Sequence, residues 1–245
     1  MSTVLPNLPQ TTAALPASGA PMPSADVVVV ANGITIPGWI NNLESYRRWA
    51  ESDGYPQSGR VSFLDGKILV DTDMEEFVTH NRVKYAFNTM FGMLLMQNPP
   101  GSFVPDRMLL VNEAANLSTE PDGLFYLWTT MQSGRLRLVP GAKAGYTQLE
   151  GTPDAVLEIV SDSSMTKDSV TLRDLYWKAQ IPEYWLVDAR KEILQFDILR
   201  HMSEGYQPTP KEGGWVRSEV LGRSFRIERS LDPLGLAQFG VQVRT

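Results

Sequence analysis

GTPDAVLEIVSDSSMTKDSVTLRDLYWKAQIPEYWLVD, residues 151–188, decides the fold of this chain. Ala155 to Val160 is a short and nearly continuous apolar run, which is typical of a strand that is covered on both faces. One acid, Glu158, interrupts this run. A buried carboxylate is costly without a partner, and a metal ion would make the position useful as well as tolerable. A water-facing or salt-bridged side chain is the alternative.

The rest of the stretch predicts a helix and then a second strand. Short polar residues at 161–166 are typical of a turn and a helix cap, so a helix is expected from about Asp168. Pro182 ends the helix, and a second buried strand follows at 184–187. Strand, helix and strand form a βαβ unit, in which the strands are parallel and the polar turn lies at the carboxyl end of the first. The apolar stripe of the helix recurs at helical spacing and consists of Leu172, Leu175, Tyr176 and Ala179.

Length and composition indicate one folded domain. The chain has 245 residues, of which 42% are apolar, and this is enough for a single core over residues 27–245. Residues 1–26 are rich in Pro, Ala, Ser and Thr, and we expect them to form a disordered or loosely attached leader. No apolar run approaches the ~20 residues that span a bilayer.

The counts of particular residue types exclude several kinds of site. There is no cysteine, so a disulfide, a thiolate nucleophile and a cysteine-ligated zinc are excluded, and this suits a cytoplasmic protein. His80 and His201 are the two histidines, which is too few for a multi-histidine metal site. Carboxylates would have to hold any metal, which favours Mg²⁺ or Mn²⁺. A net charge of −6 argues against non-specific coating of nucleic acid.

The first half of the chain predicts two helices and a hairpin. A short helix is expected over residues 43–52, a hairpin with a turn at Asp65-Gly66 over 60–71, and a long helix over 74–97. Extended backwards, the apolar stripe of the long helix brings His80 and Glu76 onto the same inward face. A capping or solvated pair is the alternative for these two residues.

A second acid stands at the start of a strand. A strand is expected over residues 101–111 and another over 124–128, with Asp122 at the entry of the latter. Neighbouring strands could bring the carboxylates of Asp122 and Glu158 to one point. Two carboxylates with a carbonyl group and water provide the oxygen ligands that Mg²⁺ requires.

The remaining segments divide into a basic part and an antiparallel part. Residues 134–150 are the most basic part of the chain and are expected to form a loop that could face phosphates, with a solvated loop as the alternative. The positive charges of this loop are Arg135, Arg137 and Lys143. Beyond Asp188, short strands separated by Gly, Pro and Lys turns indicate an antiparallel extension.

Several motifs together resemble a known family. LDGKILVD, EEFVTHN, EPDGLF, DAVLEIVSDSS and YWKAQIPEYWLVDAR are similar, over residues 43–243, to the Uma-type restriction endonuclease family, a branch of the PD-(D/E)XK nuclease superfamily. The resemblance implies an α/β fold, a restriction-endonuclease-like mixed sheet flanked by helices. It also implies a divalent-metal site for hydrolysis of DNA. By this resemblance Asp122 is the metal-binding aspartate, Glu158 the second acid and His80 the histidine that opens the first long helix.

The chain departs from the family pattern at the lysine. The superfamily has a lysine two positions after the second acid, where this chain has Val160, and the Uma-type branch moves it onto the next helix, where this chain has Leu172. Lys167 in the preceding loop is our preferred replacement. Arg173 or impaired catalysis are the alternatives. Lys67 also stands where the family usually has a glutamate.

The sequence therefore predicts a Mg²⁺- or Mn²⁺-dependent endonuclease acting on DNA, with a homodimer as a possible assembly. Asp122, Glu158 and Glu76 are the expected metal ligands, and Lys167 and His80 complete the expected catalytic set. The alternative is a catalytically degenerate nuclease fold that binds nucleic acid or protein.

Overall fold

The computed structural model describes residues 27–29, 34–96, 99–141, 145–162 and 167–245. The expected leader, residues 1–26, lies outside the described residues. No helix in the described ranges is long and apolar enough to cross a membrane. The described helices are α1 (Leu43–Ala50), α2 (Arg82–Leu94), α3 (Trp128–Gln132), α4 (Arg173–Lys178) and the π-helical turns η2 (Phe77–Asn81) and η3 (Lys167–Leu172).

The central layer is a mixed six-stranded sheet with the order β14-β13-β12-β11-β8-β5. Only β11 and β12 are parallel within it, because they are the two strands joined by the predicted helix. The βαβ unit predicted from residues 151–188 is therefore confirmed. The strands are β5 (Gly101–Pro105), β8 (Gly123–Leu127), β11 (Ala155–Ile159), β12 (Glu183–Asp188), β13 (Gln195–Met202) and β14 (Gly205–Pro208).

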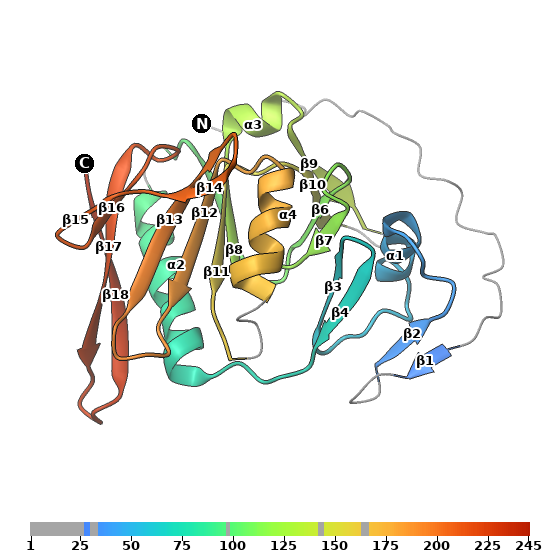
Figure 1. Ribbon diagram of the computed structural model, residues 1–245, viewed down its shortest axis with the longest axis horizontal. Coiled ribbons are helices and arrows are strands. Elements are labelled where there is room, and N and C mark those ends of the chain that lie inside the picture. The colour runs from blue at the N-terminus through green and yellow to red at the C-terminus, as the bar shows by residue number, and fades with distance from the viewer. Residues whose placement is uncertain (1–26, 30–33, 97–98, 142–144, 163–166) are drawn as a thin grey trace, which may run out of the picture.

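Helices cover both faces of the central sheet (Figure 1). On one face, Leu175 and Tyr176 of α4 join a buried cluster with Val156 and Tyr184. On the other face, the apolar stripe of α2 packs against Trp185 and its neighbours. Both faces of β11 are thus buried, as its nearly continuous apolar run predicts.

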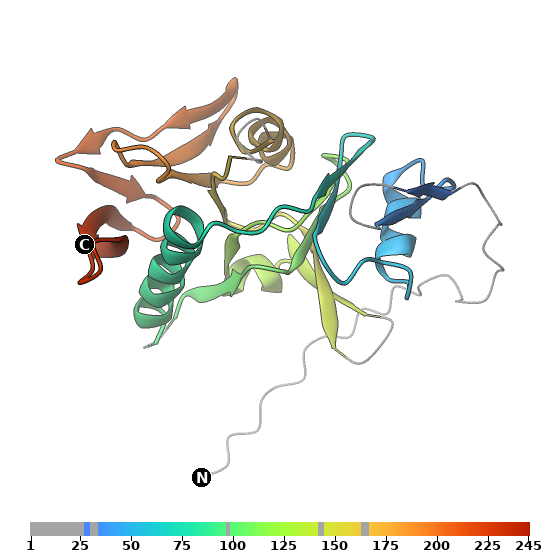
Figure 2. The ribbon, with the colours of Figure 1, turned by 90° about the horizontal axis from the view of Figure 1, so that it is seen from below.

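The C-terminal extension is a four-stranded antiparallel sheet with the order β15-β16-β17-β18. It packs its inner face on α2, so that α2 lies between two sheets (Figures 1 and 2). Glu183 of β12 ties this sheet to the centre, since its buried carboxylate accepts hydrogen bonds from Ser218, Trp185 and two backbone N–H groups. The strands are β15 (Lys211–Glu212), β16 (Trp215–Ser218), β17 (Arg223–Leu231) and β18 (Ala237–Arg244).

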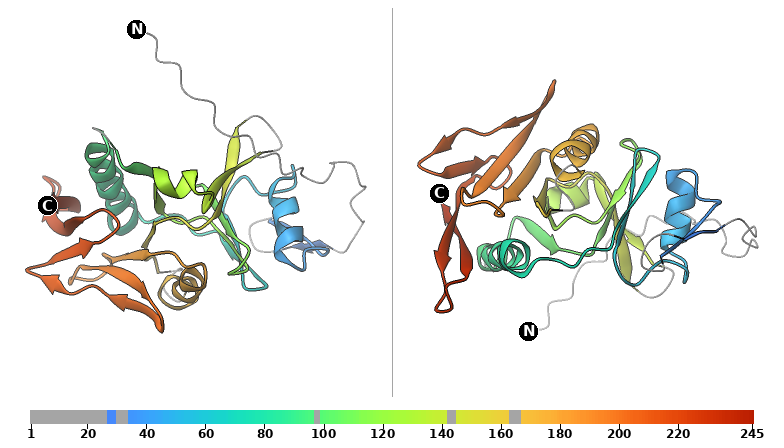
Figure 3. Two further views of the ribbon diagram at one scale, coloured as in Figure 1. Left: turned by 90° about the horizontal axis from the view of Figure 1, so that it is seen from above. Right: turned by 60° about the horizontal axis from the view of Figure 1, so that its bottom comes forward.

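A second six-stranded sheet, with the order β4-β3-β7-β6-β10-β9, forms the other side of the molecule (Figure 3). Helix α1 packs Tyr46 and Trp49 against this sheet. The Asp65-Gly66 hairpin is present as predicted. The strands are β3 (Arg60–Leu64), β4 (Lys67–Asp71), β6 (Leu109–Asn112), β7 (Leu117–Thr119), β9 (Leu136–Pro140) and β10 (Tyr146–Gly151), and a separate ribbon pairs β1 (Val27–Val29) with β2 (Thr35–Pro37).

Two local predictions were wrong. The single strand expected over residues 101–111 is two strands, β5 and β6, which belong to different sheets. The expected basic loop over 134–150 contains the antiparallel pair β9 and β10. In both cases long-range pairing partners decide the structure, and a local pattern does not contain them. The predicted fold class is confirmed: a mixed α/β core flanked by helices, with an antiparallel extension.

Candidate active site

Strand pairing brings Asp122 to the strand that carries Glu158. Asp122 directly precedes β8, and β8 pairs with β11 so that Gly123 lies opposite Leu157. The Oδ2 atom of Asp122 accepts a hydrogen bond from the backbone N–H of Ile159 at 2.8 Å. Gly123 is required here because a Cβ atom would lie 2.5 Å from the ring of Phe103. Asp122 is therefore fixed beside the end of β11.

Glu158 is buried and faces α4. Its side chain is 1% exposed, and the OH of Tyr176 donates a hydrogen bond of 2.6 Å to its Oε1. Burial raises the pKa of Glu158 to about 8, with a further contribution from the neighbouring carboxylate of Asp168. The buried acid predicted from the sequence is present, and its surroundings favour the neutral carboxyl over the carboxylate.

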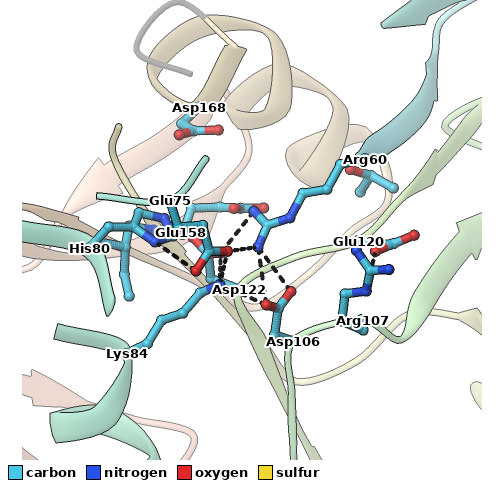
Figure 4. A network of polar contacts seen from close by, with 12 residues as sticks. Arg60, Glu75, His80, Lys84, Asp106, Arg107, Glu120, Asp122, Glu158 and Asp168 are labelled. Carbon is cyan, nitrogen blue, oxygen red and sulfur yellow. Dashed lines mark hydrogen bonds and ion pairs between the residues drawn. The ribbon is translucent and has the colours of Figure 1, made fainter. Parts of the chain in front are cut away.

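Three cationic groups surround the carboxylate of Asp122 (Figure 4). Arg60 and Lys84 each place a nitrogen 3.2 Å from Oδ1, and His80 Nε2 lies 3.4 Å from Oδ2. Burial alone would favour the neutral acid, but contacts with His80, Lys84 and Arg60 lower its pKa overall. Asp122 is thus ionised and held on every side.

Two further carboxylates balance these cations. Asp106 lies 2.7 Å from Lys84 and 3.1 Å from Arg60, and Glu75 contacts Arg60, Lys84 and His80. Contact with His80 and then with Lys84 lowers the pKa of Glu75 to about 2, against the effect of burial. Although burial opposes protonation of His80, Asp122 and Glu75 raise its pKa to about 9. In this cluster the negative charges of Asp122, Asp106 and Glu75 are therefore balanced by the positive charges of Arg60, Lys84 and His80.

The structure places Glu76 outside this cluster, which corrects the expectation that it points inwards. Glu76 has an extended backbone and caps η2, accepting hydrogen bonds from the N–H groups of Val78 and Thr79. The α-helical spacing fails because the helix begins only at Phe77, and in π-helical geometry. Glu75, one residue earlier, enters the cluster in its place.

Lys167 lies on the Glu158 side of the site. Its Nζ is 3.3 Å from Asp168 Oδ1. Burial would lower the pKa of Lys167, but the charges of Glu158 and Asp168 raise it overall, so the lysine stays protonated. The alternative, Arg173, donates to the carbonyl group of Tyr206 at 2.7 Å. Lys67, which stands where the family usually has a glutamate, is exposed on β4.

The two positions where a nuclease lysine is expected are part of the core. Leu172 is 0% exposed and packs with Leu175 and Tyr176, and Val160 is 2% exposed. Leu172 precedes Tyr176 by four residues, so it lies on the helix face whose Tyr176 hydroxyl contacts Glu158. An apolar residue therefore occupies a position on the side of the helix that faces the buried acid.

The basic segment does not contribute to the site through its arginines. Arg135 forms an ion pair with the buried Asp154, and Arg137 pairs with Glu150. Lys143 lies outside the described residues. The positive charges beside Asp122 and Glu158 come instead from Arg60, Lys84 and Lys167.

The residues present fit a divalent cation, with Asp122 as the shared ligand. Ligand atoms of Glu75, His80 and Asp122 lie within 4.8 Å of one another, but His80 is protonated there and Lys84 already compensates the acids. On the other side, Lys167 and Arg60 both interact with the charge of Glu158. Glu158 therefore adds a buried carboxylate, on the strand next to Asp122, to the oxygen ligands that a hard cation would use.

Sequence reasoning missed Arg60, Glu75, Lys84 and Asp106. Lys84 had a usable signal, since it follows His80 by four residues on the same helix and so shares its face. The other three come from a strand start and two loops, which carry no periodicity. A cleft of about 150 Å³ opens beside the cluster, and its wall includes Arg60, Glu75 and His80.

The family model described as "Uma2: Putative restriction endonuclease" matches residues 43–231. Among solved structures, the chain is similar to a protein from Anabaena variabilis described as a putative nuclease belonging to DUF820. The two share 13% sequence identity with a TM-score of 0.55, over 74% of this chain and 90% of the other. At this identity the similarity shows the fold alone. No curated protein matches the chain.

Proposed function

Because the chain belongs to the Uma2 family of restriction-endonuclease-type proteins, we propose that it is an endonuclease that hydrolyses phosphodiester bonds of DNA with Mg²⁺ or Mn²⁺. One observation carries the proposal. A buried Glu158 with a raised pKa lies on β11, which is paired with β12, and Asp122 accepts a hydrogen bond from the next residue of that strand, Ile159. Buried acids with perturbed pKa values on neighbouring strands are typical of catalytic sites.

Asp122 and Glu158 would hold the cation. When bound, a divalent cation polarises the phosphate and lowers the pKa of a water molecule. Tyr176 orients Glu158 through its 2.6 Å hydrogen bond, and Arg60 and Lys84 fix Asp122. These side chains therefore determine where the two ligand oxygens point.

Lys167 and His80 would each contribute a positive charge to the site. Lys167 stays protonated beside Glu158 and would stabilise the negative charge that develops on the phosphate. His80 is held between Asp122 and Glu75 and is protonated, so it would position Asp122 and would not serve as a base. Glu76 caps η2 and is assigned no catalytic role.

Incubation of the purified chain with supercoiled and linear DNA, with Mg²⁺, Mn²⁺ or EDTA, tests the proposal. We expect cleavage that requires the metal and is lost in Asp122→Asn and Glu158→Gln. The matched control is Glu76→Gln, which changes an exposed acid near the site and should retain activity. Metal-dependent cleavage that survives in both site variants would refute the assignment.

A second function is favoured by one observation. Leu172 and Val160 are buried apolar residues at the two positions where the lysine is expected, so the same fold could bind nucleic acid or protein without cutting. In that case the assay above would give DNA binding or no interaction, with no cleavage at any metal concentration.

A single domain over residues 27–245, a homodimeric assembly and a cytoplasmic location remain predictions. Analytical ultracentrifugation would give the assembly, and a purely monomeric chain in the presence of DNA would contradict the dimer. Limited proteolysis would test the domain boundary near residue 26, and fractionation of cells would test the location.

A further inference from the structure

Arg107 occupies a strained position at the junction of the two large sheets. It lies in the short connection between β5 of the central sheet and β6 of the other. Its φ is +75°, in the left-handed region that non-glycine residues rarely adopt. The preceding residue, Asp106, anchors this connection by its contacts with Arg60 and Lys84. The backbone strain is thus tolerated at a point where the chain is held firmly.

The side chain of Arg107 is held only weakly. It is 55% exposed, its Nε lies 4.0 Å from Glu120 Oε2, and its NH1 donates to the carbonyl oxygen of Gly59 at 3.4 Å. Among the described residues, no other acid forms an ion pair with it. Arg60, by contrast, is 18% exposed and contacts three carboxylates. Figure 4 shows Arg107 and Glu120 beside the network that surrounds Asp122.

Binding of a phosphate in the cleft beside the candidate site would require a cation that is not already paired. Its wall includes Asp71, Asp73 and Glu75, which would repel a polyanion, and Arg60 is already compensated. Arg107 lines the same cleft with a guanidinium group that is exposed and weakly paired. A guanidinium group can bind a phosphate through two parallel hydrogen bonds.

We propose that Arg107 binds a backbone phosphate of the DNA at the mouth of the cleft, and so positions the strand that Asp122 and Glu158 act on. The inference rests on the proposed function and goes beyond it by assigning the substrate contact. The alternative is a structural role, in which Arg107 serves to compensate the half-buried Glu120, whose pKa is raised by desolvation.

The substitution Arg107→Gly separates the two roles, because glycine adopts a positive φ without strain. If Arg107 is a phosphate ligand held at a cost in backbone strain, the variant melts at the same temperature or about 2–4 °C higher. DNA binding then weakens about tenfold, as expected for loss of a charge-assisted hydrogen bond. If Arg107 is structural, the melting temperature falls instead.

Two matched controls isolate the effects of backbone and charge. Gln180→Gly relaxes another non-glycine residue with positive φ, at +56°, and should not change DNA binding. Arg137→Ala removes an arginine of similar exposure, 54%, that is paired with Glu150 away from the cluster. Arg107→Lys should retain part of the affinity, because it keeps the charge and loses the two-point contact.

Binding is measured by fluorescence anisotropy with a short DNA duplex over a series of NaCl concentrations, in Mg²⁺ on a Glu158→Gln background. We expect Arg107→Gly to reduce the slope of log K against log[NaCl] by about 0.9, the value for one phosphate contact. In the otherwise wild-type chain it should raise KM for cleavage more than it lowers kcat.

The outcomes are distinguishable. An unchanged slope and affinity in Arg107→Gly, or an equal loss in Arg137→Ala, overturns the inference and leaves the nuclease proposal standing. A wild-type chain that neither binds nor cuts DNA overturns both. A destabilised Arg107→Gly variant with normal binding per folded molecule assigns Arg107 the structural role.

Discussion

Replacement of Glu158 by glutamine should remove one contribution to the pH dependence of stability in the absence of metal. The glutamine keeps the volume of the side chain and an oxygen that accepts the hydrogen bond from Tyr176, but it cannot ionise. In the wild-type chain the carboxyl is buried at 1% exposure, and its pKa of about 8 exceeds the ordinary value of 4.5. The difference between the two proteins therefore isolates the cost of ionising this one group.

The sign and the size follow from linkage. Because the folded-state pKa is raised, the stabilising effect of the proton is fully present below pH 4.5 and is lost as the pH rises through about 8. A folded-state pKa of about 8 against the ordinary 4.5 makes the cost of ionising this group a few kcal/mol. We therefore expect Glu158→Gln to gain stability of this order relative to wild type between pH 5 and pH 8.

Urea denaturation of both proteins at a series of pH values, with EDTA and with Mg²⁺, measures the effect. In EDTA the stability difference should grow with pH and level off above about pH 8. Mg²⁺ should stabilise the wild-type chain most at high pH, where no proton competes for the carboxylate, and should stabilise Glu158→Gln less. A difference that stays constant from pH 5 to pH 8 would refute the account of Glu158 as a buried acid without adequate compensation.

Three further substitutions are predicted. Tyr176→Phe removes the 2.6 Å hydrogen bond to Glu158 and should lower metal affinity or cleavage about 10–100-fold, measured by Mg²⁺ titration. Unchanged affinity would show that Tyr176 contributes to core packing alone. Glu76→Ala should cost about 1 kcal/mol of stability through loss of a helix cap, with cleavage retained. Glu75→Ala should reduce cleavage, because Glu75 contacts Lys84 beside Asp122. Equal loss of activity in the two variants would contradict the structure. Leu172→Lys should destabilise the chain by more than about 3 kcal/mol in urea without raising the rate, because residue 172 is 0% exposed and packed among apolar side chains. A stable and faster enzyme would show that this position accepts a lysine and that the lysine reaches Glu158.

Sequence patterns predicted the helices and strands whose formation depends on residues that are close together in the chain. The stretch 151–188 predicted the parallel strands and the crossover helix, since apolar periodicity reports which face of each element is buried. The same reasoning marked Glu158 as an acid in a buried strand and Asp122 as an acid at the start of another. The turn chemistry of Asp65-Gly66 predicted the hairpin for an equally local reason.

Local patterns failed where geometry departs from the ideal period. Extrapolation of an α-helical stripe selected Glu76, but the chain enters the helix at Phe77 through a π-helical turn, so that Glu75 faces the cluster. A single strand was expected across Asp106, but the chain changes sheets there. The bend places Asp106 and Arg107 at the site.

The sequence by itself determined the βαβ core and the presence of a buried acid within it, because both follow from burial patterns over a few residues. Only the tertiary structure decided which charges gather around Asp122, the acid on the neighbouring strand. Arg60, Lys84 and Asp106 come from a strand start, a helix and a loop, and they converge through pairing between distant strands. The energy of a charge cluster depends on distances in space, which the spacing of residues along the chain does not encode.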